Sequence, residues 1–270
     1  MSPGVRGSTD GASASARGPL SGDQPTAADR LRLLEKLCDP GTTDVLARIG
    51  VEPDWNCLEL GAGAGSIAYW LADRTPRGRV VAVDLDPRFI DADRAPHLTV
   101  SAEDIAEQDH PAGSFQLIHA RSVFLYLPRR EEIVERAVRW LAPGGWLLLE
   151  DVRFLPASQS PHPARRQVNG AWLAALAKQG IDLTWADRVP EVLADAGLEQ
   201  VRVSVAPGPG VDTVQGELLR LRAARGARNL DGAGPVSAPQ AVVAGELLSR
   251  LPTPDVPTSL HAVWGRKPMP

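Results

Sequence analysis

The sequence is poor in cysteine and lacks basic clusters and long apolar runs, and each shortage excludes a class of protein. Only two cysteines, Cys38 and Cys57, occur in 270 residues. Their spacing matches no metal site, and a disulfide framework is unusual at this length. The net charge is −4 without a long basic run, which argues against a nucleic-acid partner. No stretch approaches the roughly 18 apolar residues of a membrane span, and the N-terminus lacks the apolar core of a secretion signal. We therefore expect a reduced, cytoplasmic protein without a bound metal.

The composition, 43% hydrophobic and 23% charged, is that of a globular protein with a substantial core. Residues 1–24 are rich in Gly, Ser and Pro and predict a disordered tail, so that 25–270 form a single domain. Helical spacing of leucines predicts a helix over 27–39, and a second short helix is expected at 42–50.

From residue 56 onward, short β-prone runs alternate with helical patterns. Strands are expected at 56–62, 78–86, 97–104, 115–120 and 146–151, with an amphipathic helix at 129–141. This alternation predicts a parallel sheet covered by helices on both faces. Beyond Asp151 the pattern loosens, with strands expected only at 199–206 and 259–266. The segments at about 155–185 and 207–257 are therefore candidates for a helical cap over a site.

The stretch "CLELGAGAGS", residues 57–66, places Gly61, Gly63 and Gly65 where the first strand gives way to a helix. Ligands of open parallel sheets bind beyond the carboxyl ends of the strands, so this turn faces the expected crevice. A dinucleotide fingerprint needs Gly or Ala at position 66, and Ser66 weakens a nicotinamide interpretation. Asp84 ends the second strand and can accept hydrogen bonds from both hydroxyls of a ribose. Asp86 competes for this role and is less favoured.

Five blocks together resemble a known family: "LELGAGAGSIAYWLA", "VVAVDLDPRF", "EDIAEQDHPAGSFQLIHAR", "LAPGGWLLLED" and "AVWGRKP". They are similar, in order and over roughly residues 26–267, to the class I S-adenosylmethionine-dependent methyltransferases, particularly small-molecule enzymes of GC-rich bacterial genomes. The resemblance implies an α/β, Rossmann-like fold with a seven-stranded, mostly parallel sheet, an antiparallel last strand and a helical cap. It also implies S-adenosylmethionine as cofactor.

The resemblance assigns cofactor contacts residue by residue. They are Glu59, Gly61, Gly63 and Gly65 for the methionine part, Asp84 with Leu85 for the ribose, Asp104 and Ile105 for the adenine, and Ala120 and Arg121 where cofactor and substrate pockets meet. Two positions depart from the family pattern. Gln116 stands where Asp is usual, and Tyr126 stands where relatives often carry His.

Methyl transfer from a sulfonium requires that the reactants are oriented and that water is excluded. It requires a general base only if the acceptor is protonated when it binds. His119 and Tyr126 are the catalytic candidates; the alternatives are a hydrogen-bonded strand residue and an ordinary pocket wall. His162 could act from a loop, and Arg121 could bind an acidic substrate or pair with a carboxylate. An aromatic acceptor pocket is expected to be lined by Tyr126, Phe154, Trp172 and Trp185, although packing of the cap onto the sheet explains the tryptophans equally simply.

The leading hypothesis is methyl transfer to an oxygen or nitrogen of a small secondary metabolite, by a monomer or homodimer. A second hypothesis keeps the cofactor and drops the transfer: a cyclase or scaffold with the same fold. A third, nicotinamide-dependent oxidoreduction, is disfavoured by Ser66.

Overall fold

The structure is a computed structural model that describes residues 27–160, 163–178, 180–206 and 258–270. The predicted tail at 1–24, His162 and the cap segment at 207–257 lie outside the described residues and stay predictions. No helix in the described ranges combines the length and the apolar character that crossing a membrane requires.

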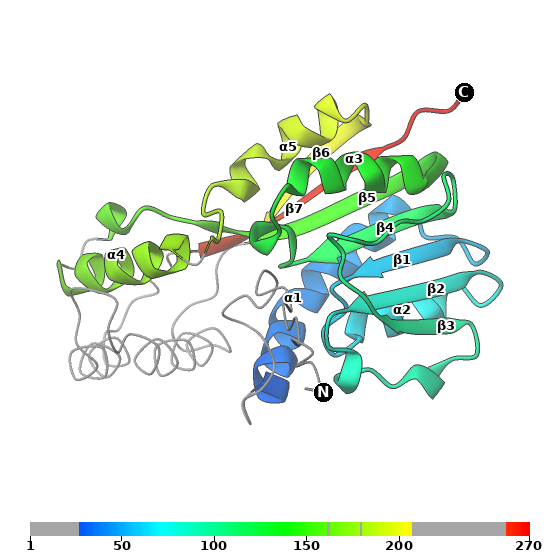
Figure 1. Ribbon diagram of the computed structural model, residues 1–270, viewed down its shortest axis with the longest axis horizontal. Coiled ribbons are helices and arrows are strands. Elements are labelled where there is room, and N and C mark those ends of the chain that lie inside the picture. Colours follow the sequence, from blue (N-terminus) through cyan, green and yellow to red (C-terminus); the bar gives the residue numbers. More distant parts are fainter. Residues whose placement is uncertain (1–26, 161–162, 179, 207–257) are drawn as a thin grey trace, which may run out of the picture.

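A single seven-stranded sheet organises the described part of the chain (Figure 1). Its strands follow the order β3-β2-β1-β4-β5-β7-β6. Strands β1 to β5 pair in parallel, whereas β7 runs antiparallel to both β5 and β6. The predicted fold class is thereby confirmed, including the antiparallel last strand. The strand bounds are β1 (Asn56–Leu60), β2 (Arg79–Asp84), β3 (Leu98–Ala102), β4 (Phe115–Arg121), β5 (Leu141–Phe154), β6 (Glu199–Ala206) and β7 (Thr258–Arg266).

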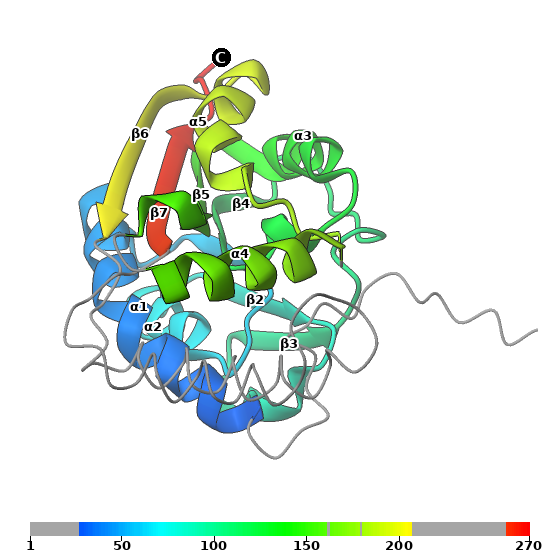
Figure 2. The same cartoon turned by 90° about the vertical axis from the view of Figure 1, so that its left-hand side faces the viewer.

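Helices cover the two faces of the sheet, as Figure 2 shows. Helices α1 (Ala27–Ile49) and α2 (Ser66–Arg74) lie on one face, and α3 (Arg130–Trp140) and α5 (Trp185–Asp195) lie on the other. Helix α4 (Pro163–Lys178) lies beyond the carboxyl end of β5 (Figure 1). Short 3-10 turns complete the described elements: η1 (Pro87–Phe89), η2 (Ala92–Arg94), η3 (Phe124–Tyr126) and η4 (Ala157–Gln159).

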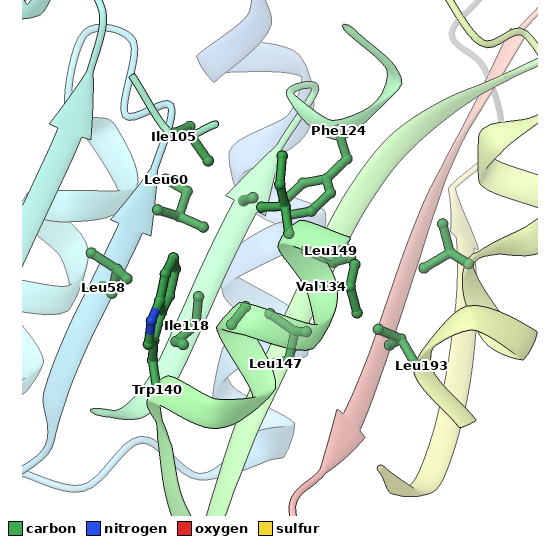
Figure 3. Close-up of a cluster of buried hydrophobic side chains, with 14 of the residues drawn as sticks. Leu58, Leu60, Ile105, Ile118, Phe124, Val134, Trp140, Leu147, Leu149 and Leu193 are labelled. Atoms are coloured by element: carbon green, nitrogen blue, oxygen red, sulfur yellow. The ribbon is translucent and has the colours of Figure 1, made fainter. Parts of the chain in front are cut away.

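The larger hydrophobic core lies between the sheet and the α3–α5 layer (Figure 3). Alternate residues of the central strands face it, so that Leu147 and Leu149 of β5 point to this side while Leu148 points to the other. Trp140 of α3 and Leu193 of α5 contribute to the cluster from the helical layer (Figure 3). Because both faces are covered, the central strands read as nearly continuous apolar runs.

The two short helices predicted at 27–39 and 42–50 form one helix, α1, which continues through Pro40. A proline inside a helix removes one backbone donor and normally ends or kinks it. Here the hydroxyls of Thr42 and Thr43 bond back to the carbonyls of Cys38 and Asp39, at 3.2 and 2.8 Å. The second half of α1 also contributes buried apolar residues to the α1–α2 core, which fixes the helix against the sheet.

Candidate cofactor site at the carboxyl edge of the sheet

The connection from β1 to α2 is a turn of left-handed glycines. Gly61, Gly63 and Gly65 have φ values of +70°, +61° and +91°, a region that residues with a Cβ rarely adopt. A Cβ at Gly61 would lie 2.2 Å from Val123 Cγ2, and one at Gly65 would lie 2.8 Å from Tyr69 Cζ. The turn therefore requires glycine for two reasons: its backbone has positive φ angles, and neighbouring side chains occupy the space that a Cβ would need.

The turn is tied to the end of β2. The N–H of Gly61 donates to the carbonyl of Val83 at 2.8 Å, and the N–H of Gly63 donates to Asp84 Oδ2 at 2.8 Å. The other carboxylate oxygen of Asp84 accepts from the N–H of Asp86 at 2.9 Å. Burial raises the pKa of Asp84, and these backbone hydrogen bonds oppose the rise. The Asp84 carboxylate is thus held in a fixed orientation beside the glycine turn, as its predicted role requires.

The end of β3 presents the residues predicted to face an adenine. Asp104 Oδ1 accepts from the N–H of Ala106 at 2.8 Å, which orients its carboxylate locally. Ile105 belongs to the larger core, where it is buried. Leu85, directly after β2, is 52% exposed and offers an apolar surface to solvent.

A buried network of charged side chains joins the three strands β1, β4 and β5. His119 in the centre of β4 has no exposed surface, and it lies between two carboxylates from the neighbouring strands. Its Nδ1 is 2.7 Å from Glu59 Oε2, and its Nε2 is 3.2 Å from Glu150 Oε2. Burial alone would lower the pKa of His119, but the charge of Glu59 and the hydrogen bonds to Glu150 and Glu59 raise it to about 9.

The polar network continues into helix α1. Thr42 is fully buried, and its hydroxyl donates to Glu150 Oε2 at 2.5 Å. Arg121 donates to Thr42 Oγ1 at 2.8 Å and to Asp39 Oδ1 at 2.7 Å. Ser66, the first residue of α2, donates to the same oxygen of Asp39 at 3.1 Å. Helix α1 is therefore joined by polar contacts to β4, β5 and the start of α2.

The predicted substrate wall is only partly assembled in the described residues. Tyr126 and Phe154 are half-buried and pack against the larger core. Trp185 has no exposed surface; it stacks on Phe124 and donates from Nε1 to Asp151 Oδ2 at 2.9 Å, which corresponds to the packing alternative. Trp172 lies in α4, and its side chain is not among those that the structure describes.

Two further predicted residues lie at the end of β4. Ala120 is buried. Arg121 is paired with Asp39. This corresponds to the alternative in which it pairs with a carboxylate of the protein, and not to the one in which it binds an acidic substrate.

Asp39, Thr42 and Glu150 were missed by sequence reasoning, although they complete the site's polar network. Glu150 is the strand partner of Arg121 and lies two residues after Leu148, the strand partner of His119, so the register puts it on the same face of the sheet as the imidazole. Thr42 and Asp39 belong to a helix whose place on the sheet no local pattern indicates.

Comparison with known proteins relates part of the chain to a family. Residues 58–147 match the family described as a methyltransferase domain, and this range contains the last part of β1, the glycine turn, Asp84 and β4. This part of the chain is therefore similar to a methyltransferase domain, in agreement with the resemblance that the sequence blocks indicate. Methyltransferase str3 of Strobilurus tenacellus is 34% identical over 114 residues, which is 42% of this chain and 40% of that protein. The chain thus spans well under half the length of this curated relative.

Solved methyltransferase structures share the fold. Phosphoethanolamine N-methyltransferase 2 of Haemonchus contortus, in complex with phosphomonomethylethanolamine and S-adenosylhomocysteine, superposes with a TM-score of 0.60 at 15% identity. That match covers 92% of this chain and 59% of the other. The [4+2]-cyclase SpnF superposes with a TM-score of 0.53 at 18% identity, over 85% of this chain and 81% of the cyclase.

Proposed function

We propose that this protein transfers a methyl group from S-adenosylmethionine to an oxygen or nitrogen atom of a small-molecule acceptor. The observation that carries the proposal is the glycine turn with Asp84 fixed against the N–H of Gly63. A phosphate-free cofactor needs close backbone approach and a carboxylate for its ribose, and it does not need an anion cradle. These residues fit S-adenosylmethionine on both counts.

Each end of the cofactor has residues suited to it. Each oxygen of the Asp84 carboxylate accepts a backbone hydrogen bond, from Gly63 or from Asp86, and the remaining lone pairs of the carboxylate would accept from ribose hydroxyls. Exposed Leu85 would pack against the sugar and base, and Asp104 with the backbone of Ile105 would recognise the adenine. Glu59 and the glycines would adjoin the methionine part, whose amino group and sulfonium favour a nearby carboxylate.

The cofactor supplies an activated methyl group on a sulfonium, and transfer is an in-line displacement. The protein contributes mainly orientation and exclusion of water, effects worth up to roughly 7–11 kcal/mol for well-placed reactants. Tyr126, half-buried on η3 beyond the end of β4, would orient the acceptor from the substrate side.

His119 has no part as a base in this proposal. A general base must come within hydrogen-bond reach of the proton that it removes. The imidazole of His119 is enclosed, and both of its ring nitrogens face carboxylates. The catalytic role predicted for it is therefore replaced by a structural one, argued below.

A second candidate function is cyclisation without methyl transfer. It is favoured by one observation, the shared fold of the [4+2]-cyclase SpnF. Both candidates predict cofactor binding, and they differ in whether the cofactor is consumed during turnover.

The test is incubation of the protein with S-adenosylmethionine and a panel of small phenols, amines and carboxylic acids, followed by measurement of S-adenosylhomocysteine. Methyl transfer predicts release with at least one acceptor, and loss of release in Asp84→Ala. Substrate conversion with intact cofactor would favour the cyclase. A protein that binds NADH and not S-adenosylmethionine would overturn both.

A further inference from the structure

His119 occupies an unusual position, because a single imidazole bridges two buried carboxylates from different strands. Glu59 and His119 are direct partners in the β1–β4 register, so their side chains leave the same face of the sheet. Glu150 reaches the opposite ring nitrogen from β5. The side chains of all three are at most 5% exposed. Buried ionised carboxylates are costly unless they are paired, and this ring is the partner that they share.

The directions of the hydrogen bonds indicate the charge of the ring. A guanidinium only donates, so Arg121 donates to Thr42 Oγ1, and the single hydroxyl proton of Thr42 has two acceptors, Glu150 Oε2 at 2.5 Å and the carbonyl of Cys38 at 3.2 Å. An ionised carboxylate only accepts, so with Glu150 and Glu59 ionised Nε2 of His119 donates to Glu150 Oε2 and Nδ1 donates to Glu59 Oε2. Two donating ring nitrogens mean an imidazolium.

We propose that His119 is a positioning residue that is an imidazolium throughout the neutral pH range, holding Glu59 beside the glycine turn and linking it through Glu150 and Thr42 to helix α1. Its role is to join two parts of the cofactor site that are far apart in the chain. Seating of α1 and orientation of the Glu59 carboxylate then depend on one proton. The consequence for the cofactor rests on the proposed function, whereas the charge of the ring and the seating of α1 do not.

The surrounding charges support this state. The ionisable groups of the network are Glu59 from β1, Glu150 from β5, Glu35 and Asp39 from α1, and His119 and Arg121 from β4. With the ring charged, four carboxyl groups face two cations; with the ring neutral, they face one. Within this network, the charges of Glu59 and Glu150 and the hydrogen bonds to them are the physical reason why the pKa of His119 rises to about 9 despite complete burial. The proton is therefore retained throughout the neutral pH range.

Helix α1 has a direct path to the glycine turn. A Cβ at Gly63 would lie 3.2 Å from Leu31 Cδ2, so this part of α1 packs against the turn itself. Asp39 contacts Ser66 immediately after the turn, and Thr42 anchors the next part of the helix to β5. Loss of the imidazolium would leave Glu59 and Glu150 as uncompensated neighbours and weaken this anchor.

The first test requires no substitution. In the full chain labelled with ¹⁵N-histidine, NMR should detect a His119 ring with both nitrogens protonated from pH 6 to pH 8, losing a proton near pH 9. A neutral ring at pH 7 would overturn the proposal. This readout involves no cofactor and is unaffected if the proposed function fails.

The second test compares His119→Gln with the matched control His97→Gln. His97 is a half-buried histidine that bonds only a backbone carbonyl, that of Ala72 at 2.9 Å, away from the site. Amide hydrogen exchange should be accelerated in residues 39–46 of α1 by His119→Gln and by Thr42→Val, but not by His97→Gln. Equal exchange in all three variants would contradict the link to α1.

Calorimetry with S-adenosylhomocysteine extends the test to the site. His119→Gln should weaken binding by about tenfold or more, because charged hydrogen bonds that orient Glu59 are lost. His97→Gln should bind like the wild type. A protein in which no variant binds this ligand would refute the proposed function, while the NMR and exchange results would still decide the role of His119. Unaltered affinity in a folded His119→Gln variant would remove His119 from the site.

Discussion

Substituting Gly61 by alanine tests whether the turn requires glycine for space as well as for backbone freedom. Gly50, at the end of α1, provides a matched control. It has a similar φ of +82°, but a Cβ there would meet no atom within 4 Å. Both substitutions place an alanine in the left-handed region, which costs about 1–2 kcal/mol. Only Gly61→Ala adds a collision, with Val123 Cγ2 at 2.2 Å.

The collision sets the expected difference between the two variants. A methyl group at 2.2 Å forces a backbone or side-chain shift, and overpacking of this kind costs about 1–3 kcal/mol. Gly61→Ala should therefore lower the free energy of unfolding by about 2–5 kcal/mol, against about 1–2 kcal/mol for Gly50→Ala. Truncating Val123 to alanine removes Cγ2 and leaves Cβ at 3.5 Å, an ordinary contact.

The assay is urea denaturation of the single variants and of Gly61→Ala combined with Val123→Ala. In the Val123→Ala background, Gly61→Ala should cost no more than Gly50→Ala costs in the wild type, so a coupling energy of about 1–3 kcal/mol is expected between the two sites. Equal losses for Gly50→Ala and Gly61→Ala, or strict additivity with Val123→Ala, would refute the steric argument.

Three further variants test other parts of the account. Asp84→Ala should weaken S-adenosylhomocysteine binding by about 10–100-fold in calorimetry, because two charge-assisted hydrogen bonds are lost; unchanged affinity would remove Asp84 from the site. Burial raises the pKa of Asp151 to about 8, so the native state holds its proton more tightly than the unfolded chain does. Relative to Asp151→Asn, the wild type should lose on the order of 5 kcal/mol of unfolding free energy as pH rises from about 4 to about 8; parallel pH profiles would contradict this. Trp185→Ala should cost about 3–5 kcal/mol in denaturation, because the ring is fully buried against Phe124; a cost below about 1 kcal/mol would mean that the ring is not part of the core.

The strand and helix pattern was predictable because it depends on local periodicity. The alternation from residue 56 to 151 predicted five parallel strands, and all five are present. The division of α1 at Pro40 was wrong, because the proline rule is local while the packing of Val45 and Leu46 on the sheet is not. Tertiary contacts override local signals where a segment buries enough apolar surface.

The polar part of the site was less predictable, because it depends on strand register. The glycines and Asp84 follow from their places at strand ends, whereas the pairing of Glu59 with His119 requires knowing which residues of β1 and β4 are opposite each other. A single sequence does not contain that information. The substrate wall was harder still, since Phe154 and the cap lie beyond the regular alternation, where no periodicity constrains position.

The central claim is that the glycine turn at 61–65 and the carboxylate of Asp84 hold an adenosyl cofactor at the carboxyl edge of the sheet. A crystal structure of the protein with S-adenosylhomocysteine tests it most directly. The account predicts both ribose hydroxyls within hydrogen-bond distance of Asp84 and the amino-acid part of the ligand against the glycine turn. A ligand bound elsewhere, or a ribose directed away from Asp84, would contradict it.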